Sequence, residues 1–165
     1  MLLFASGPSP GPRWRPRFAL ADSVSATEPV RLTPSEAARR FAAARVARLG
    51  TAGTDQQPHL VPVTFALVGD RVVIAVDGKP KRSTELRRLR NIRQNPAVCL
   101  LADHYDEDWT RLWWVRADGR ATIEAADPEP YLTALRAKYP QYQHVPLGGP
   151  LILIETTRWT GWSYR

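Results

Sequence analysis

The residues with the clearest chemical potential are the cations that follow the apolar run of residues 72–76. They are Lys79, Lys81, Arg82, Arg87, Arg88, Arg90 and Arg93. Ser83 or Thr84 can cap a helix that begins among them, and Asn95, which precedes a proline, is expected to end it. Free backbone N–H groups and the helix dipole favour an anion at such a start. The segment therefore predicts an anion-binding site, with a solvated basic helix as the alternative.

A cluster of carboxylates lies further along the chain, at Asp103, Asp106, Glu107 and Asp108. These residues could hold a hard cation, but they lack the ligand spacing and the turn glycine of a calcium loop. Ion pairs with nearby arginines, or across a subunit boundary, are the favoured interpretation. The chain has no Gly-x-Ser-x-Gly elbow, no Walker loop and no Gly-x-Gly-x-x-Gly after a strand. We therefore predict no metal site and assign no catalytic side chain.

Three tryptophans, Trp109, Trp113 and Trp114, follow the carboxylates. In a strand, Trp113 and Trp114 must face opposite sides, so one can enter a core while the other covers a surface. Arg116 shares the face of Trp114. An exposed tryptophan near several cations indicates a ligand wall or a subunit contact. The alternative is that the chain's own helices bury both.

Short strands joined by hairpins are expected to position these groups. Apolar or β-rich runs predict strands near residues 46–52, 59–68, 72–76, 97–102, 112–117, 120–124 and 150–162. Gly69-Asp70 and Asp118-Gly119 are signals for hairpin turns. Pro62 needs an edge strand or a bulge, because proline cannot donate to the ladder.

Three helices are expected between these strands. Thr33 and Glu36 form a capping-box pattern for the first, which runs to about Arg45, and the cationic segment supplies the second. Asp127 is expected to cap the third, which continues to Tyr139. The sum is mainly β: six or seven antiparallel strands in a small barrel with peripheral helices.

Composition sets the wider bounds. The 165 residues fit one domain, and 44% hydrophobic with 24% charged residues allow a sizeable core. Residues 1–30 are rich in proline and are predicted to be a disordered tail, which leaves residues 31–165 as the domain. The net charge of +7 favours nucleic acid, an anionic membrane surface or a phosphorylated small molecule as partner. A single cysteine, Cys99, and the lack of a membrane-length apolar run favour a cytoplasmic protein.

Four stretches resemble the split β-barrel proteins of the pyridoxamine-phosphate-oxidase-like superfamily, in particular the class that uses coenzyme F420. They are residues 58–65 (PHLVPVTF), 77–82 (DGKPKR), 86–96 (LRRLRNIRQNP) and 103–120, which include the Asp-Trp-x-x-Leu-Trp-Trp-Val-Arg run. The resemblance covers about residues 31–165. It depends on the order of these motifs rather than on any one of them.

This resemblance implies an antiparallel split β-barrel of the FMN-binding type, in a homodimer with two equivalent sites between the barrels. The cofactor ring is expected against the strand that carries Thr64, with its phosphate on basic residues of the cationic segment. The implied cofactor-binding residues are Thr64, Lys79, Lys81, Arg82, Arg88, Asn91, Trp113 and Arg116. Trp113 and Arg116 are expected near the site, or to reach it from the other subunit. The many arginines would also suit the acidic oligoglutamate tail of F420, which FMN lacks.

The implied function is an F420-dependent oxidoreductase that transfers a hydride between the deazaflavin and a small organic acceptor. The protein's part is to align the two and exclude water, with Arg116 or Thr64 as groups that could polarise the acceptor. An FMN-binding oxidase or reductase is the nearest alternative. Full pyridoxamine-phosphate oxidase activity is not expected, because we cannot identify, in the C-terminal segment, the residues with which that family binds the phosphate of its substrate. A non-enzymatic haem or flavin module and a basic nucleic-acid binder are the other classes considered.

Overall fold

Antiparallel pairing organises the chain around two long strands, β7 (Trp113–Glu124) and β8 (Leu151–Ser163), which pair along nearly their whole length. The computed structural model describes residues 30–76, 86–125 and 129–164. Within these residues one eight-stranded sheet has the order β3-β2-β6-β7-β8-β5-β4, and β1 (Val30–Arg31) pairs separately with β8. The other strands are β2 (Ala47–Ala52), β3 (Pro58–Val63), β4 (Ala66–Val68), β5 (Arg71–Ala75) and β6 (Ala97–His104). The expectation of a mainly β, antiparallel architecture is confirmed.

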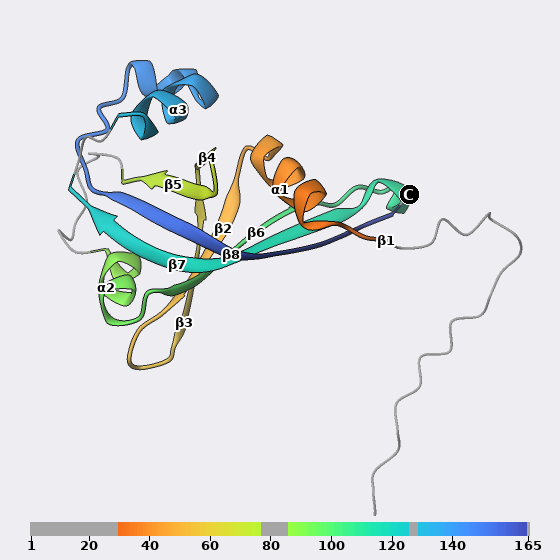
Figure 1. Ribbon diagram of the computed structural model, residues 1–165, viewed down its shortest axis with the longest axis horizontal. Coiled ribbons are helices and arrows are strands. Elements are labelled where there is room, and N and C mark those ends of the chain that lie inside the picture. The colour runs from red at the N-terminus through yellow and green to blue at the C-terminus, as the bar shows by residue number, and fades with distance from the viewer. Residues whose placement is uncertain (1–29, 77–85, 126–128, 165) are drawn as a thin grey trace, which may run out of the picture.

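Three α-helices and two short 3-10 helices complete the described fold. They are α1 (Pro34–Ala43), α2 (Arg87–Gln94), α3 (Tyr131–Lys138), η1 (Trp109–Arg111) and η2 (Pro140–Gln143). In Figure 1, α2 and α3 lie toward the end of the sheet opposite to the C-terminus, whereas α1 packs on β7 and β8. None of these described helices is long and apolar enough to cross a membrane.

The predicted capping box of α1 is present. The Thr33 side chain accepts a hydrogen bond from the backbone of Glu36, and the Glu36 carboxylate accepts one from the Thr33 N–H at 2.9 Å. The Thr33 hydroxyl also donates to the Glu36 carboxylate at 2.7 Å, and this bond, together with the one from the Thr33 N–H, lowers the pKa of Glu36. The helix then buries Ala37 and Phe41 in the main core, where the ring of Phe41 meets those of Phe65 and Trp159. A second, smaller core lies under α3 and is built on Leu132 and Leu135.

The prediction of a hairpin turn at Asp118-Gly119 is wrong, because β7 continues through both residues. The register against β8 shifts there: Asp118 pairs with Arg158 and Gly119 with Thr156, so Thr157 is an extra residue in β8. A Cβ on Gly119 would lie 2.4 Å from the carbonyl oxygen of Glu155. The glycine therefore permits close approach of two strands at a bulge, which a sequence pattern does not distinguish from a turn.

The single strand predicted over residues 59–68 is two strands, β3 and β4, separated by Thr64 and Phe65. The Phe65 N–H bonds to the hydroxyl of Tyr139 at 3.1 Å instead of to a neighbouring strand. The edge position expected for Pro62 is confirmed, because β3 ends the sheet. The Gly69-Asp70 turn is also confirmed: it joins β4 to β5, with Gly69 at φ 61°.

Two predicted helix starts are wrong. Leu86, and not Ser83 or Thr84, is the N-cap of α2, which has no side-chain cap; Ser83 and Thr84 lie outside the described residues. The third helix begins at Tyr131, with Pro130 as N-cap, rather than after the predicted cap Asp127, which lies outside the described residues. There the Glu129 carboxylate accepts from the Thr133 N–H at 3.2 Å, so a different acidic residue satisfies the first turn. Asn95 ends α2 as predicted.

Candidate functional site

A cleft of about 330 Å³ lies where β3, β5, α2 and η2 approach one another. Its apolar lining comes from Pro62, Val63, Ile74, Ala75 and Val145. Its polar lining comes from Thr64, Arg88, Gln141 and Tyr142. The volume is at the lower end of the range for small-molecule sites, and the lining combines apolar side chains with several polar groups. We call this hollow the Thr64 cleft.

The Thr64 cleft brings together two of the residues that the sequence indicates for cofactor binding, Thr64 and Arg88. Thr64 follows β3, and Arg88 is in the first turn of α2. Ala75 closes β5 just before residues 77–85, and Arg88 follows them in α2, so residues from both sides of this stretch line the cleft. The predicted phosphate ligands Lys79, Lys81 and Arg82 lie outside the described residues.

A tyrosine that the sequence analysis did not single out completes one wall of the Thr64 cleft. The hydroxyl of Tyr142 is hydrogen-bonded to that of Thr64, and either oxygen can be the donor. Tyr142 follows Tyr139 by three residues, and their rings meet edge to face with centroids 5.7 Å apart. The sequence signal that could have identified Tyr142 is its position three residues after Tyr139, on the other side of Pro140. Buried tyrosine hydroxyls need hydrogen-bond partners, so such a pair indicates polar contacts nearby.

Asn91, a predicted phosphate ligand, is placed differently from Arg88. It is buried, and its side-chain nitrogen donates to the Thr51 hydroxyl at 3.1 Å. The neighbouring Gln94 accepts from the Thr54 N–H at 3.1 Å. These bonds fasten α2 to β2 and its turn, so Asn91 acts on the site by holding the helix that carries Arg88.

Arginines of α2 also influence β3. Partial burial lowers the pKa of His59, and the positive charges of Arg87 and Arg88 lower it further. The positive charges of Arg87 and Arg88 therefore reach β3, the strand that leads directly to Thr64.

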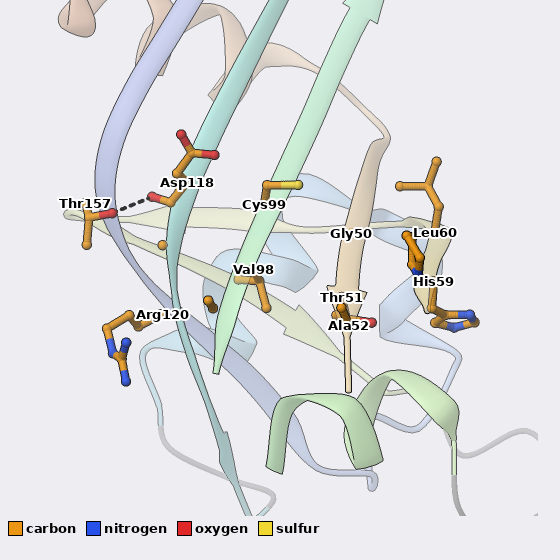
Figure 2. A pocket seen from close by; sticks show the side chains of 13 residues that line it. Gly50, Thr51, Ala52, His59, Leu60, Val98, Cys99, Asp118, Arg120 and Thr157 are labelled. Carbon is orange, nitrogen blue, oxygen red and sulfur yellow. Dashed lines mark hydrogen bonds between the residues drawn. The ribbon is translucent and has the colours of Figure 1, made fainter. Parts of the chain in front are cut away.

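A larger groove, of about 770 Å³, lies on the outer face of strands β3, β2, β6 and β7. Figure 2 shows His59 and Leu60 at one side, Arg120 and Thr157 at the other, and Cys99 between them. The floor consists of small residues, among them Gly50 and Gly119. A mostly apolar groove without convergent polar groups offers contact area rather than chemistry. We call it the outer groove.

The outer face continues from this groove toward Trp114 and Arg116. Both line a hollow of about 470 Å³ that shares Leu60 and Cys99 with the outer groove. Arg116 bonds to Asp118 at 2.9 Å, and the same carboxylate receives Arg158 at 2.9 Å. Trp114 and Arg116 therefore share a face, as the strand period predicts.

Trp113 faces the opposite side and packs against the main core. The guanidinium of Arg40 lies 5.8 Å from its ring centroid, and His104 stacks on it at 6.4 Å. Trp113 pairs with Ser163 at the end of β7 where the chain terminates, whereas α2 packs near the other end (Figure 1). Within one chain, Trp113 and Arg116 thus lie apart from Thr64 and Arg88.

The predicted cluster of carboxylates at residues 103–108 contributes ion pairs and a helix cap in the described part of the chain. Arg111 bonds to Asp106 at 3.0 Å, and Asp103 pairs with Arg48 across the sheet. Asp108 caps η1 by accepting from the Thr110 N–H at 3.0 Å. Among described residues, no group of three His, Cys, Asp or Glu side chains is arranged to hold a metal ion.

The architecture and the family are shown by comparison. The sheet and its three helices form a split β-barrel, the class of fold to which the solved structures similar to this chain belong. The family model described as pyridoxamine 5'-phosphate oxidase matches residues 34–163, and the chain belongs to that family. A search of curated proteins found no match.

Three solved structures illustrate the likeness. A conserved hypothetical protein from Mycobacterium tuberculosis is 22% identical with a TM-score of 0.64, over 81% of this chain and 86% of that one. An FAD-binding protein from Mesorhizobium loti is 20% identical with a TM-score of 0.58, over 82% and 96%. The haem storage protein from Vibrio cholerae is 12% identical with a TM-score of 0.60, over 81% and 95%. At these identities the likeness establishes the fold.

Proposed function

We propose that this protein is a cytoplasmic oxidoreductase that binds a flavin-type cofactor in the Thr64 cleft and passes a hydride between it and a small organic acceptor. The expected cofactor is the deazaflavin coenzyme F420, with FMN as the alternative. The observation that carries the proposal is that Thr64, Ala75 before residues 77–85 and Arg88 after them line one cleft. Family membership and the FAD-binding neighbour support a flavin-type group.

The lining of the Thr64 cleft fits such a group. Apolar side chains can cover a planar ring, two hydroxyls can bind its polar edge, and Arg88 offers a cation for the phosphate. Exposed Arg90 and Arg93 on α2 would suit the acidic tail of F420. The bound ring would supply the hydride chemistry, so the residues of this chain need only bind it, orient it and exclude water.

We further propose a homodimer that uses the outer face. That face exposes Leu60, which is 66% accessible, together with Cys99 and the half-buried Trp114. Pro62 lines the Thr64 cleft and shares the outer face with Leu60, so a second barrel on this face would lie beside the cleft. Trp113 and Arg116 of one barrel would then serve the cleft of the other.

Titration of the protein with F420 and, separately, with FMN tests the cofactor by quenching of ligand fluorescence. We expect F420 to bind more tightly than FMN. Tight binding of FMN alone would transfer the proposal to a flavin oxidase or reductase, and binding of neither would refute it. A Soret band in the protein as isolated would instead favour a haem-binding module.

A further inference from the structure

The two hydroxyls of the Thr64 cleft form a unit with defined hydrogen-bonding capacity. Thr64 and Tyr142 are hydrogen-bonded to each other, so the O–H of one donates to the oxygen of the other. Whichever donates, one O–H and free lone pairs remain for a third group. Both side chains line the cleft and are partly buried. The pair can therefore donate to one ligand atom and accept from the next.

Neighbouring residues fix this pair in place. The Tyr139 hydroxyl accepts from the Phe65 N–H and lies 2.9 Å from the carbonyl oxygens of Phe65 and Arg45, to either of which it can donate. The Lys138 ammonium donates to the Ala42 carbonyl at 2.8 Å and lies 3.7 Å from the centroid of the Phe65 ring. Thr64 is thus held through the residue beside it in the chain.

The same anchors hold the other member of the pair. Tyr142 N–H bonds to the Tyr139 carbonyl at 2.9 Å, and the two rings are in contact. The buried Tyr139 therefore holds both members of the pair: Tyr142 directly, and Thr64 through its neighbour Phe65. A wall whose groups are already placed loses little entropy when a ligand binds.

We propose that Tyr142 is a ligand-contacting residue which, together with Thr64, binds the edge of a planar heteroaromatic ring carrying adjacent carbonyl and N–H groups. The pyrimidine edge of a flavin or deazaflavin ring is such an edge. This inference rests on the proposed function and deepens it. It assigns the ring edge to Thr64 and Tyr142, and leaves the phosphate to the cationic side of the cleft.

Removal of each hydroxyl at nearly constant shape tests the assignment. Tyr142→Phe and Thr64→Val should each weaken binding of the ring by roughly 3- to 10-fold, the usual effect of a lost neutral hydrogen bond. Because the two hydroxyls act as a unit, the double variant should lose less than the product of the two factors. Tyr131→Phe is the matched control, since its hydroxyl accepts from Arg71 at an exposed position outside the cleft.

A second readout separates ligand contact from a merely structural role. The probes are FMN and its 5-deaza analogue, each with and without a methyl group on ring N3. The methyl group replaces the hydrogen of the N–H group at the edge. The wild-type protein should bind the N3-methyl probe several-fold more weakly than the parent, and Tyr142→Phe should reduce this discrimination. Tyr131→Phe should keep it.

The outcomes are distinct. If the wild-type protein binds neither parent ring nor F420, the proposed function fails and this inference fails with it. If the wild type binds but Tyr142→Phe and Thr64→Val bind equally well, only the inference fails. If both variants weaken parent and N3-methyl probes by the same factor, the pair does not touch the edge, which also overturns it. Thermal unfolding of each variant identifies any that have lost the fold, and the remaining variant then decides.

Discussion

Two adjacent rows of residues cross the same five strands and face opposite sides. The inner row is Val61, Leu49, Leu100, Ala117 and Trp159, and the outer row is Leu60, Gly50, Cys99, Asp118 and Arg158. Every inner residue belongs to the main core or packs against it. The outer row mixes apolar, small and ion-paired residues. Folding therefore demands only apolar volume on one face and leaves the other face free for association.

The Thr64 cleft differs from both rows. It has less than half the volume of the outer groove, about 330 against 770 Å³, yet it has two bonded hydroxyls and an arginine. The outer groove offers contact area, whereas the Thr64 cleft offers polar groups that can bind a ligand. We therefore propose ligand binding in the cleft and subunit contact on the outer face, and variants in the inner row, the cleft and the outer groove test the three regions separately.

The largest effect is expected on the inner row. Leu100 is fully buried, so Leu100→Ala should lower the free energy of unfolding by about 3 kcal/mol, through lost transfer energy and a residual cavity. Its neighbour Cys99 faces outward, and Cys99→Ala should cost less than about 1 kcal/mol. Urea unfolding of the two variants measures both. Similar losses would show that the two faces are not as different as the rows indicate.

The next effect separates the cleft from the outer groove. Arg88→Met should weaken binding of a phosphorylated ring such as FMN by about 10- to 100-fold, the range for a hydrogen bond to a charged group. Binding of riboflavin, which lacks the phosphate, should change much less. Arg120→Met, at the rim of the outer groove, is the matched control and should leave both affinities unchanged. Equal losses of affinity for FMN and riboflavin would show that Arg88 does not bind the phosphate.

A smaller effect is expected for subunit association. Leu60→Glu puts a charge on the outer face and should raise the dimer dissociation constant about 10-fold or more, because a buried unpaired carboxylate is unfavourable. Val46→Glu is the control, since Val46 is also exposed, at 45%, but does not line the outer groove. Light scattering across a dilution series gives both constants. A wild-type protein that is monomeric at high concentration would contradict the outer-face dimer.

The sequence predicted the inner row better than the site. Alternating or continuous apolar runs are imposed by burial, so β2, β5, β6 and the face of Trp114 and Arg116 could be predicted locally. The capping box of Thr33 and Glu36 could also be predicted, because its hydrogen bonds are local in the sequence. The hairpin turn predicted at Asp118-Gly119 was wrong because a turn and a bulge both need a residue without a bulky side chain. The distinction depends on Glu155, which is distant in the chain.

The candidate site depended on contacts that no local pattern contains. The meeting of Thr64 and Tyr142 joins residues 78 positions apart. Asn91 matched the resemblance by position, but its partner Thr51, 40 residues away, uses its amide inside the fold. The resemblance therefore indicated the cleft through Thr64 and Arg88, whereas the hydroxyl wall required the tertiary structure.

The smallest effect concerns the support behind the cleft and depends on pH. Lys138 is half-buried, and desolvation, with a further contribution from Arg45, lowers its pKa from 10.5 to about 8. Arg45 and Tyr139 are the titratable groups that face it, and among described residues no carboxylate forms a salt bridge with it. The folded protein thus releases this proton at a lower pH than the unfolded chain does.

Between pH 8 and 10.5 the unfolded chain binds more protons at Lys138, so this residue makes the free energy of unfolding rise with pH. The full shift corresponds to roughly 3 kcal/mol at 1.36 kcal/mol per pKa unit, but partial solvent exposure reduces it to about 1 kcal/mol. The stability of the wild type relative to Lys138→Met should therefore increase by about that amount from pH 7 to pH 10. Urea unfolding of both proteins at the two pH values measures this difference and cancels other titrating groups. A difference that falls with pH would mean that the protonated ammonium, through Ala42 and the Phe65 ring, stabilises the support more than desolvation opposes it.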